Sequence, residues 1–125
     1  MDLAIEIGTV CEGVTLVRMK GRIDLYTAPL LRDCLSNLIG KGNLGLVANL
    51  AAVGFLGLTG RQILAAEQDH VRSYGGFLWL VGPPRRTTAF WKELDSSFTT
   101  FDTEEAARQH FTEHIMPAHG SQDER

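Results

Sequence analysis

The chain has 125 residues, enough for one domain with a single hydrophobic core. Hydrophobic residues make up 44% of it, which is typical of a globular protein. The formal net charge is -3 at pH 7, which excludes a general nucleic-acid-binding domain because such domains carry an excess of basic residues. It shows neither a basic leader nor an apolar run of the roughly 18 residues that span a bilayer. We therefore expect a cytoplasmic protein with no direct nucleic-acid partner and no membrane partner.

Local patterns in the first half predict a hairpin, a helix and a buried strand. Apolar and polar residues alternate over 3–10 and 14–21, which predicts two antiparallel strands joined by a tight turn. A helical period follows over 27–42, with Thr27 as its expected cap. The apolar run 44–50 has the length of a strand that is covered on both faces.

The second half alternates helices and strands. In chain order we expect a helix over 61–76, a strand over 77–82, a short helix over 87–94, a strand over 97–101 and a helix over 102–115. Tyr74 is expected to face inward on the first of these helices, and Asp102 is expected to cap the last one. The order predicts an α/β fold with a mixed, mainly parallel sheet of four to five strands and about four helices. Residues 1–116 form the expected single domain, and 117–125 an expected disordered tail.

The stretch VGFLGLTGRQ, residues 53–62, predicts a strand end, a tight turn and a helix start. Thr59 and Gln62 have the spacing of a capping box, which would contribute about 1 kcal/mol to helix stability. Leu58 beside glycines suits either an exposed contact with a hydrophobic partner or an inward contact at the helix start. The N-terminus of a helix also favours a phosphate group on a hydroxyl there, because its N–H groups are unpaired and its dipole end is positive. Arg61 adds a positive charge nearby.

Four segments carry a resemblance to a known family: VRMKGRIDLYTAPLLRDCL, LVANLAAVGFLGLTGRQIL, GGFLWLVGPP and FDTEEAARQHF. Together they resemble the STAS domain, and most closely its bacterial anti-sigma factor antagonists. The most specific parts are the Gly-x-x-Asp turn from Gly21 to Asp24 and the Phe-Leu-x-x-[Ser/Thr]-Gly turn before the second helix. The resemblance implies a STAS-type fold over most of the chain.

The resemblance also implies a function. In the antagonists, an anti-sigma factor that is also a serine/threonine kinase phosphorylates a hydroxyl at the start of the second helix. The unphosphorylated antagonist binds that kinase and frees the sigma factor, and a phosphatase resets the phosphorylated form. Matched position by position, the acceptor falls on Thr59, and Gly60 matches the glycine that follows it.

This sequence departs from the family pattern around the acceptor. The family reads Asp-Ser-[Ser/Thr]-Gly where this chain has Gly57-Leu58-Thr59-Gly60, and Leu-Asp-Leu where it has Ala48-Asn49-Leu50. Two carboxylates that would border the acceptor are therefore expected to be missing. A kinase that reads those acids should phosphorylate Thr59 poorly.

We therefore expect a regulatory protein-binding module rather than an enzyme, with no cofactor and no metal. Its expected partner is an anti-sigma factor of the kinase type, with a phosphatase and a second copy of the chain as further candidates. The alternatives are a constitutive binder or scaffold without the switch, and a small-ligand sensor that uses the sheet edge or a pocket beside the second helix. The candidate phosphorylation site is Thr59, and the candidate partner-binding residues are Asp24, Gly57, Leu58, Thr59, Gly60 and Arg61.

Three other features predict less. Asp24 is also a turn residue that can bond local backbone. His110 and His114 share a helix face but lack a third metal ligand. Cys11 and Cys34 lack a CxxC spacing and are expected to be free thiols.

Overall fold

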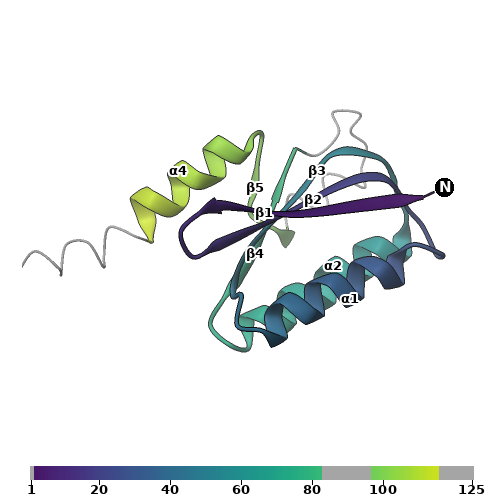
Figure 1. The fold of residues 1–125 in the computed structure, drawn as a ribbon, viewed down its shortest axis with the longest axis horizontal. Coiled ribbons are helices and arrows are strands. Elements are labelled where there is room, and N and C mark those ends of the chain that lie inside the picture. Colours follow the sequence, from purple (N-terminus) through teal and green to yellow (C-terminus); the bar gives the residue numbers. More distant parts are fainter. Residues whose placement is uncertain (1, 83–96, 116–125) are drawn as a thin grey trace, which may run out of the picture.

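The computed structural model describes residues 2–82 and 97–115, which form a five-stranded sheet with helices on both faces (Figure 1). In chain order the described elements are β1 (Leu3–Cys11), β2 (Val14–Ile23), α1 (Ala28–Gly40), β3 (Gly45–Leu56), α2 (Leu58–Arg72), β4 (Phe77–Val81), β5 (Thr100–Phe101) and α4 (Glu104–His114). The strands lie side by side in the order β1-β2-β3-β4-β5. The β1–β2 pair is antiparallel and the other three pairs are parallel, as the sequence predicts.

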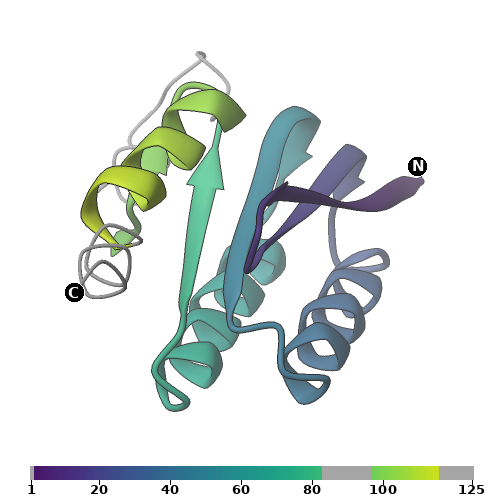
Figure 2. The ribbon, with the colours of Figure 1, turned by 60° about the vertical axis from the view of Figure 1, so that its left-hand side comes forward.

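The sheet separates two apolar layers. The helices α1 and α2 cover one face and α4 covers part of the other, as Figure 2 shows. The larger core lies between the sheet and the helices α1 and α2, and a smaller cluster that includes Trp79 and Ala107 lies on the side of α4. Successive side chains of β2 point to opposite faces of the sheet, so β2 contributes to both layers. Val17 and Met19 lie in the larger core, and Leu16 lies in the smaller cluster.

The central strands β3 and β4 are buried on both faces, which confirms the prediction from their apolar runs. β3 continues beyond the apolar run 44–50 to Leu56, so it ends within the stretch 53–62 where the sequence predicts a strand end. Its extra residues pair with the end of β2, where Arg22 lies beside Phe55 and Ile23 beside Leu56.

Several expected helix details are wrong. Tyr74 is exposed, because α2 ends at Arg72 and Tyr74 lies in the turn beyond it. Thr103, not Asp102, caps α4, and its side chain accepts a hydrogen bond from the backbone N–H of Ala106. Three helices lie within the described residues, and the helix expected over 87–94 lies outside them, as does the expected tail 117–125.

The helix α1 begins after Thr27 as expected, but the Thr27 side chain does not cap it. Its hydroxyl donates instead to the carbonyl of Arg22 and accepts from the backbone N–H of Asp24, at 2.8 and 2.9 Å. The residue therefore stabilises the preceding loop, which carries part of the candidate site.

Candidate functional site

The candidate site lies at the carboxyl ends of β2 and β3. Because these strands are parallel neighbours, the loop after β2 and the start of α2 lie side by side. The backbone N–H of Gly57 donates to the carbonyl of Ile23 at 2.9 Å and joins the two segments. Sequence segments about thirty residues apart thus form one surface around Thr59.

Thr59 is the second residue of α2, and the expected capping box is wrong. Gly57 is the N-cap, in an extended conformation, and no side chain caps the helix. Among the described residues the Thr59 hydroxyl has no hydrogen-bond partner, and the side chain is half-buried. Because β3 stays extended to Leu56, the helix starts at Leu58 and Thr59 already lies in its first turn.

The first turn of α2 also supplies unpaired donors. The intrahelical bonds begin with the N–H of Arg61, which donates to the carbonyl of Gly57 at 3.1 Å. The N–H groups of Leu58, Thr59 and Gly60 precede it and have no partner within the helix. The Thr59 side chain therefore projects from the positive end of a helix dipole.

Gly60 fixes how closely this turn packs on the sheet. A Cβ atom at Gly60 would lie 2.4 Å from Cγ2 of Ile23 and 2.8 Å from Cδ1 of Leu56. Both neighbours are buried, so neither has room to move. A glycine directly after Thr59 is thus a packing requirement in this chain.

The loop before α1 is organised by Asp24. Its Oδ1 accepts hydrogen bonds from the backbone N–H groups of Tyr26 and Thr27, at 2.9 and 3.0 Å, and its Oδ2 accepts from Arg22. These bonds, with the one from Thr27 first, lower the pKa of Asp24 below its ordinary value. The prediction that Asp24 bonds local backbone is confirmed, and its carboxylate shapes the loop that presents Leu25 and Tyr26.

Exposed apolar side chains gather at the end of the molecule that carries Thr59. We call this the tip surface; it consists of Leu25, Tyr26, Leu30, Phe55 and Leu58. They are five of the eight large apolar side chains that are exposed in the described residues, so the exposure is concentrated at this end of the molecule. Tyr26 is 87% exposed and Leu58 57% exposed, which rules out the inward contact considered for Leu58. The guanidinium of Arg22 lies over the Phe55 ring, 4.1 Å from its centroid.

Asn49 does not border Thr59, contrary to expectation. About seven residues of extended strand, or roughly 20 Å, separate it from the end of β3. Its side chain donates to Glu104 of α4 at 2.6 Å, and Arg18 donates two further bonds to the same carboxylate. The bonds from Arg18 lower the pKa of Glu104 below its ordinary value, with Asn49 as a smaller cause. Of the two departures from the family pattern, only the one at Gly57 and Leu58 therefore changes the surroundings of Thr59.

The remaining features do not form a second site of the expected kind. His110 and His114 stack on each other, and no group of three metal-binding side chains occurs within residues 2–82 and 97–115. Cys11 and Cys34 are both free and half-buried. No helix in the described part of the chain is long and apolar enough to cross a membrane.

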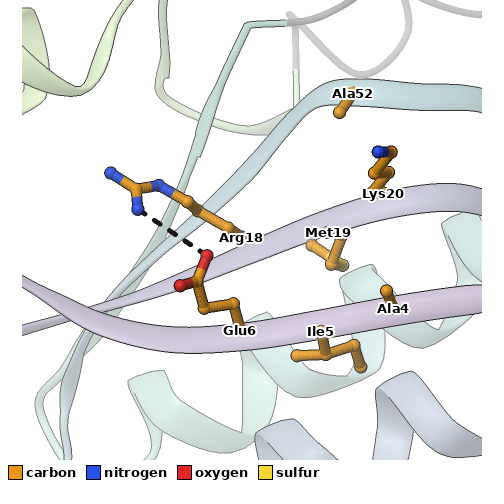
Figure 3. A pocket seen from close by; sticks show the side chains of 7 residues that line it. All are labelled: Ala4, Ile5, Glu6, Arg18, Met19, Lys20 and Ala52. Atoms are coloured by element: carbon orange, nitrogen blue, oxygen red, sulfur yellow. Dashed lines mark ion pairs between the residues drawn. The ribbon is translucent and has the colours of Figure 1, made fainter.

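A hollow of about 290 Å³ lies between β1, β2 and β3, on the face of the sheet that α1 and α2 do not cover (Figure 3). Small side chains and charged ones line it together, among them Ala4, Ala52 and Lys20, and the figure shows Glu6 turned toward Arg18. It is at the lower limit of ligand-pocket volumes. It does not lie beside the second helix, where a ligand pocket was one of the expectations from the sequence.

Two groups in the structure lie outside the residues predicted from the sequence. The first is the pair Leu25 and Tyr26, and the signal for it is an apolar pair directly after a turn aspartate. The second is Glu67, which is 7% exposed, accepts from the Ser36 hydroxyl at 3.0 Å and lies 3.0 Å from Nδ1 of His70. It ties α1 to α2, and its place on the buried stripe with Leu64 was the available signal.

Comparison with known proteins agrees with this architecture. A model of the STAS domain matches residues 9–107. The chain is 33% identical over 93 residues to the anti-sigma-F factor antagonist RsfB of Mycobacterium tuberculosis, over 74% of this chain and 76% of the relative. The chain therefore belongs to the STAS domain family, as its motifs predict.

Two solved structures show the same fold. The structure of an anti-sigma factor antagonist from Mycobacterium paratuberculosis matches with a TM-score of 0.72 and 29% identity, over 86% of this chain and 95% of that one. The anti-sigma factor antagonist SpoIIAA in its unphosphorylated form matches with a TM-score of 0.72 and 17% identity, over 90% of this chain and all of that one. The latter likeness concerns the fold alone.

Proposed function

We propose that this chain is an anti-sigma factor antagonist, a regulatory module that binds an anti-sigma factor through the tip surface in the bacterial cytoplasm. The relative that is 33% identical carries that function in its name. The observation that carries the proposal is the gathering of exposed apolar side chains around the start of α2. Exposed apolar side chains that gather at one end of a domain are typical of protein–protein contact sites. The proposed role is binding and not catalysis, and it requires no cofactor.

The partner we propose is an anti-sigma factor of the serine/threonine kinase type, with Thr59 as its phosphorylation site. Two observations support Thr59 as the acceptor: its hydroxyl is not used in a helix cap, and the unpaired N–H groups of the first turn favour an anion. A phosphothreonine would place about -1.5 to -2 charges in the middle of the tip surface. Docking against an apolar partner surface would then require burying that charge, so the modified form would be released until a phosphatase restores it.

One observation favours a second candidate, a constitutive binder without the switch. Gly57 and Leu58 stand where the family has an acid and a serine, so a kinase that reads those side chains would find neither. Leu58 then adds to the apolar contact area. Both candidates use the same surface and differ only in whether Thr59 is modified.

The first experiment examines the modification. The purified chain is incubated with ATP and the kinase-type anti-sigma factor encoded in the same genome, and intact mass and peptide mapping follow. The switch predicts a single phosphate on Thr59 that is absent from Thr59→Val, a variant of nearly equal shape. An unmodified chain that still binds the anti-sigma factor would support the constitutive binder.

The second experiment measures binding of the same anti-sigma factor by calorimetry. Thr59→Val is expected to bind like the unmodified chain, whereas Thr59→Glu is expected to bind at least 100-fold more weakly. Thr112→Glu, on the exposed side of α4, is the matched control and should bind normally.

The contribution of the tip surface is measured in the same way. Tyr26→Ala should weaken binding by roughly 30-fold, the loss expected for a central aromatic contact. Tyr74→Ala removes an exposed tyrosine at the other end of α2 and should have no effect. Equal affinities of these two variants would refute the proposed docking surface, whether or not Thr59 is phosphorylated.

A further inference from the structure

The outer edge of β1 has no strand beside it. β1 is the end strand of the sheet and, among the described residues, it pairs only with β2. It is nine residues long, contains no proline, lysine or arginine, and has Glu6 as its one charged residue. Natural sheets protect such edges with prolines, lysines or covering segments, because an open edge is a template for another strand.

The hydrogen bonds of β1 show which backbone groups face this open edge. The N–H of Arg22 donates to the carbonyl of Asp2 at 3.2 Å, so these two residues form a hydrogen-bonded antiparallel pair. Pairing alternates along β1, with Glu6 opposite Arg18 and Ile7 opposite Val17. Consequently the N–H and C=O groups of the odd-numbered residues Ile5, Ile7 and Thr9 point away from β2.

Ile7 is the middle residue of β1, and its side chain is 48% exposed. It lies among the outward-pointing backbone groups. From these observations we propose that two copies of this chain form a dimer by antiparallel pairing of their β1 edges, with the two-fold axis at Ile7.

Charge excludes one alternative register. An axis at Glu6 would set two carboxylates directly opposite each other, which is destabilising. An axis at Ile7 sets Glu6 opposite Gly8 of the second copy, where there is no side chain, while Arg18 lies 3.8 Å from Glu6 on its other side. The same axis packs Ile7 of one copy against Ile7 of the other. It also brings the open N–H and C=O groups of Ile5 opposite those of Thr9 in the second copy.

The expected dimer is weak and reversible. β1 leaves its regular register with β2 between Thr9 and Cys11, so about five residues of each copy, from Ile5 to Thr9, pair regularly. At about 3.4 Å per residue this contact is roughly 17 Å long. We expect a contact of this length along one strand edge to bury less than the roughly 1,200 Å² of the usual stable interface, which predicts a weak dimer.

The dimer does not depend on the proposed function. The tip surface follows the carboxyl ends of β2 and β3, whereas the pairing uses the outer edge of β1. Antiparallel pairing would hold the two tip surfaces at opposite ends, and both would remain open to partners. Such a dimer would present two binding sites to a multivalent partner.

Sedimentation velocity from about 1 to 500 μM tests the proposal on the chain alone. The unmodified chain should show a reversible monomer–dimer equilibrium. Ile7→Pro removes an edge N–H that makes no bond to β2, and Ile7→Lys adds an edge charge. Both variants should remain monomeric, while the control Tyr74→Lys should dimerise normally. A chain that is monomeric throughout, or a dimer that persists in both Ile7 variants, would overturn the proposal.

Crosslinking tests the register. In a chain whose native cysteines are replaced by serine, Ile7→Cys should form a disulfide-linked dimer with copper-phenanthroline, because hydrogen-bonded partners lie about 5.5 Å apart at Cα. Thr9→Cys is the matched control, since Thr9 of one copy would lie opposite Ile5 of the other copy and not opposite its Thr9. Crosslinking of Thr9→Cys as efficient as that of Ile7→Cys would refute the axis at Ile7.

Discussion

Replacing Gly60 with alanine tests the packing that places Thr59. In a helix alanine is favoured over glycine by about 1 kcal/mol when nothing opposes the new methyl group. At Gly60 that group would lie 2.4 Å from a buried methyl of Ile23 and 2.8 Å from one of Leu56. Forced contacts of this kind in a packed core cost about 1–3 kcal/mol. Set against that gain, we expect a net loss of up to about 2 kcal/mol in the free energy of unfolding, or up to roughly 8 °C in Tm.

Gly40 provides the matched control. It is the last residue of α1, and a Cβ atom there would have no heavy atom within 4 Å apart from its chain neighbours and the backbone of its own helix. Gly40→Ala should therefore stabilise the protein by about 0.5–1 kcal/mol. Urea unfolding of both variants, followed by circular dichroism, measures the two effects. If Gly60→Ala stabilises the protein as Gly40→Ala does, the close contact between α2 and the ends of β2 and β3 is refuted.

Two further predictions concern the attachment and capping of α4. Thr103→Ala should lower the free energy of unfolding by about 1 kcal/mol because it removes the observed cap, whereas Asp102→Ala should lower it by no more than about half of that; equal losses in thermal unfolding would contradict this assignment. Glu104→Gln should cost under about 1 kcal/mol at neutral pH, since its partner Arg18 is half-exposed. Because the folded-state pKa of Glu104 is lowered, its contribution is complete above its ordinary pKa of 4.5 and is lost as the pH falls below that value. Stability measured from about pH 6 to pH 3 should therefore fall more steeply for the unmodified chain than for Glu104→Gln, and parallel curves would contradict this.

Much of the architecture could be predicted because the local spacing of apolar residues indicates which segments form strands and helices. Alternation over residues 14–21 is enough to assign Leu16 and Val17 to opposite faces of β2, since successive side chains of a strand point in opposite directions. The uniformly apolar run at 77–82 likewise predicts a strand that is covered on both faces. These predictions need no knowledge of distant residues.

The helix ends were predicted less well, because more than one neighbouring residue can serve as the N-cap of a helix. Thr59 and Gln62 have the spacing of a capping box, yet the helix begins earlier, at Leu58, where the extended end of β3 pairs with β2. Asp102 and Thr103 are both good caps, and local sequence does not decide between them. In each case the boundary is set by where the chain meets the sheet.

The sequence by itself determined the order of the elements, the family, and the position of Thr59 at the start of the second helix. Only the tertiary structure decided which residues surround Thr59 and which do not. Asn49 turns to Glu104, 55 residues away, while Leu25 and Tyr26 reach the start of α2 from another loop. The physical reason is that periodicity and capping act within a few residues, whereas a surface is assembled by strand pairing between distant segments.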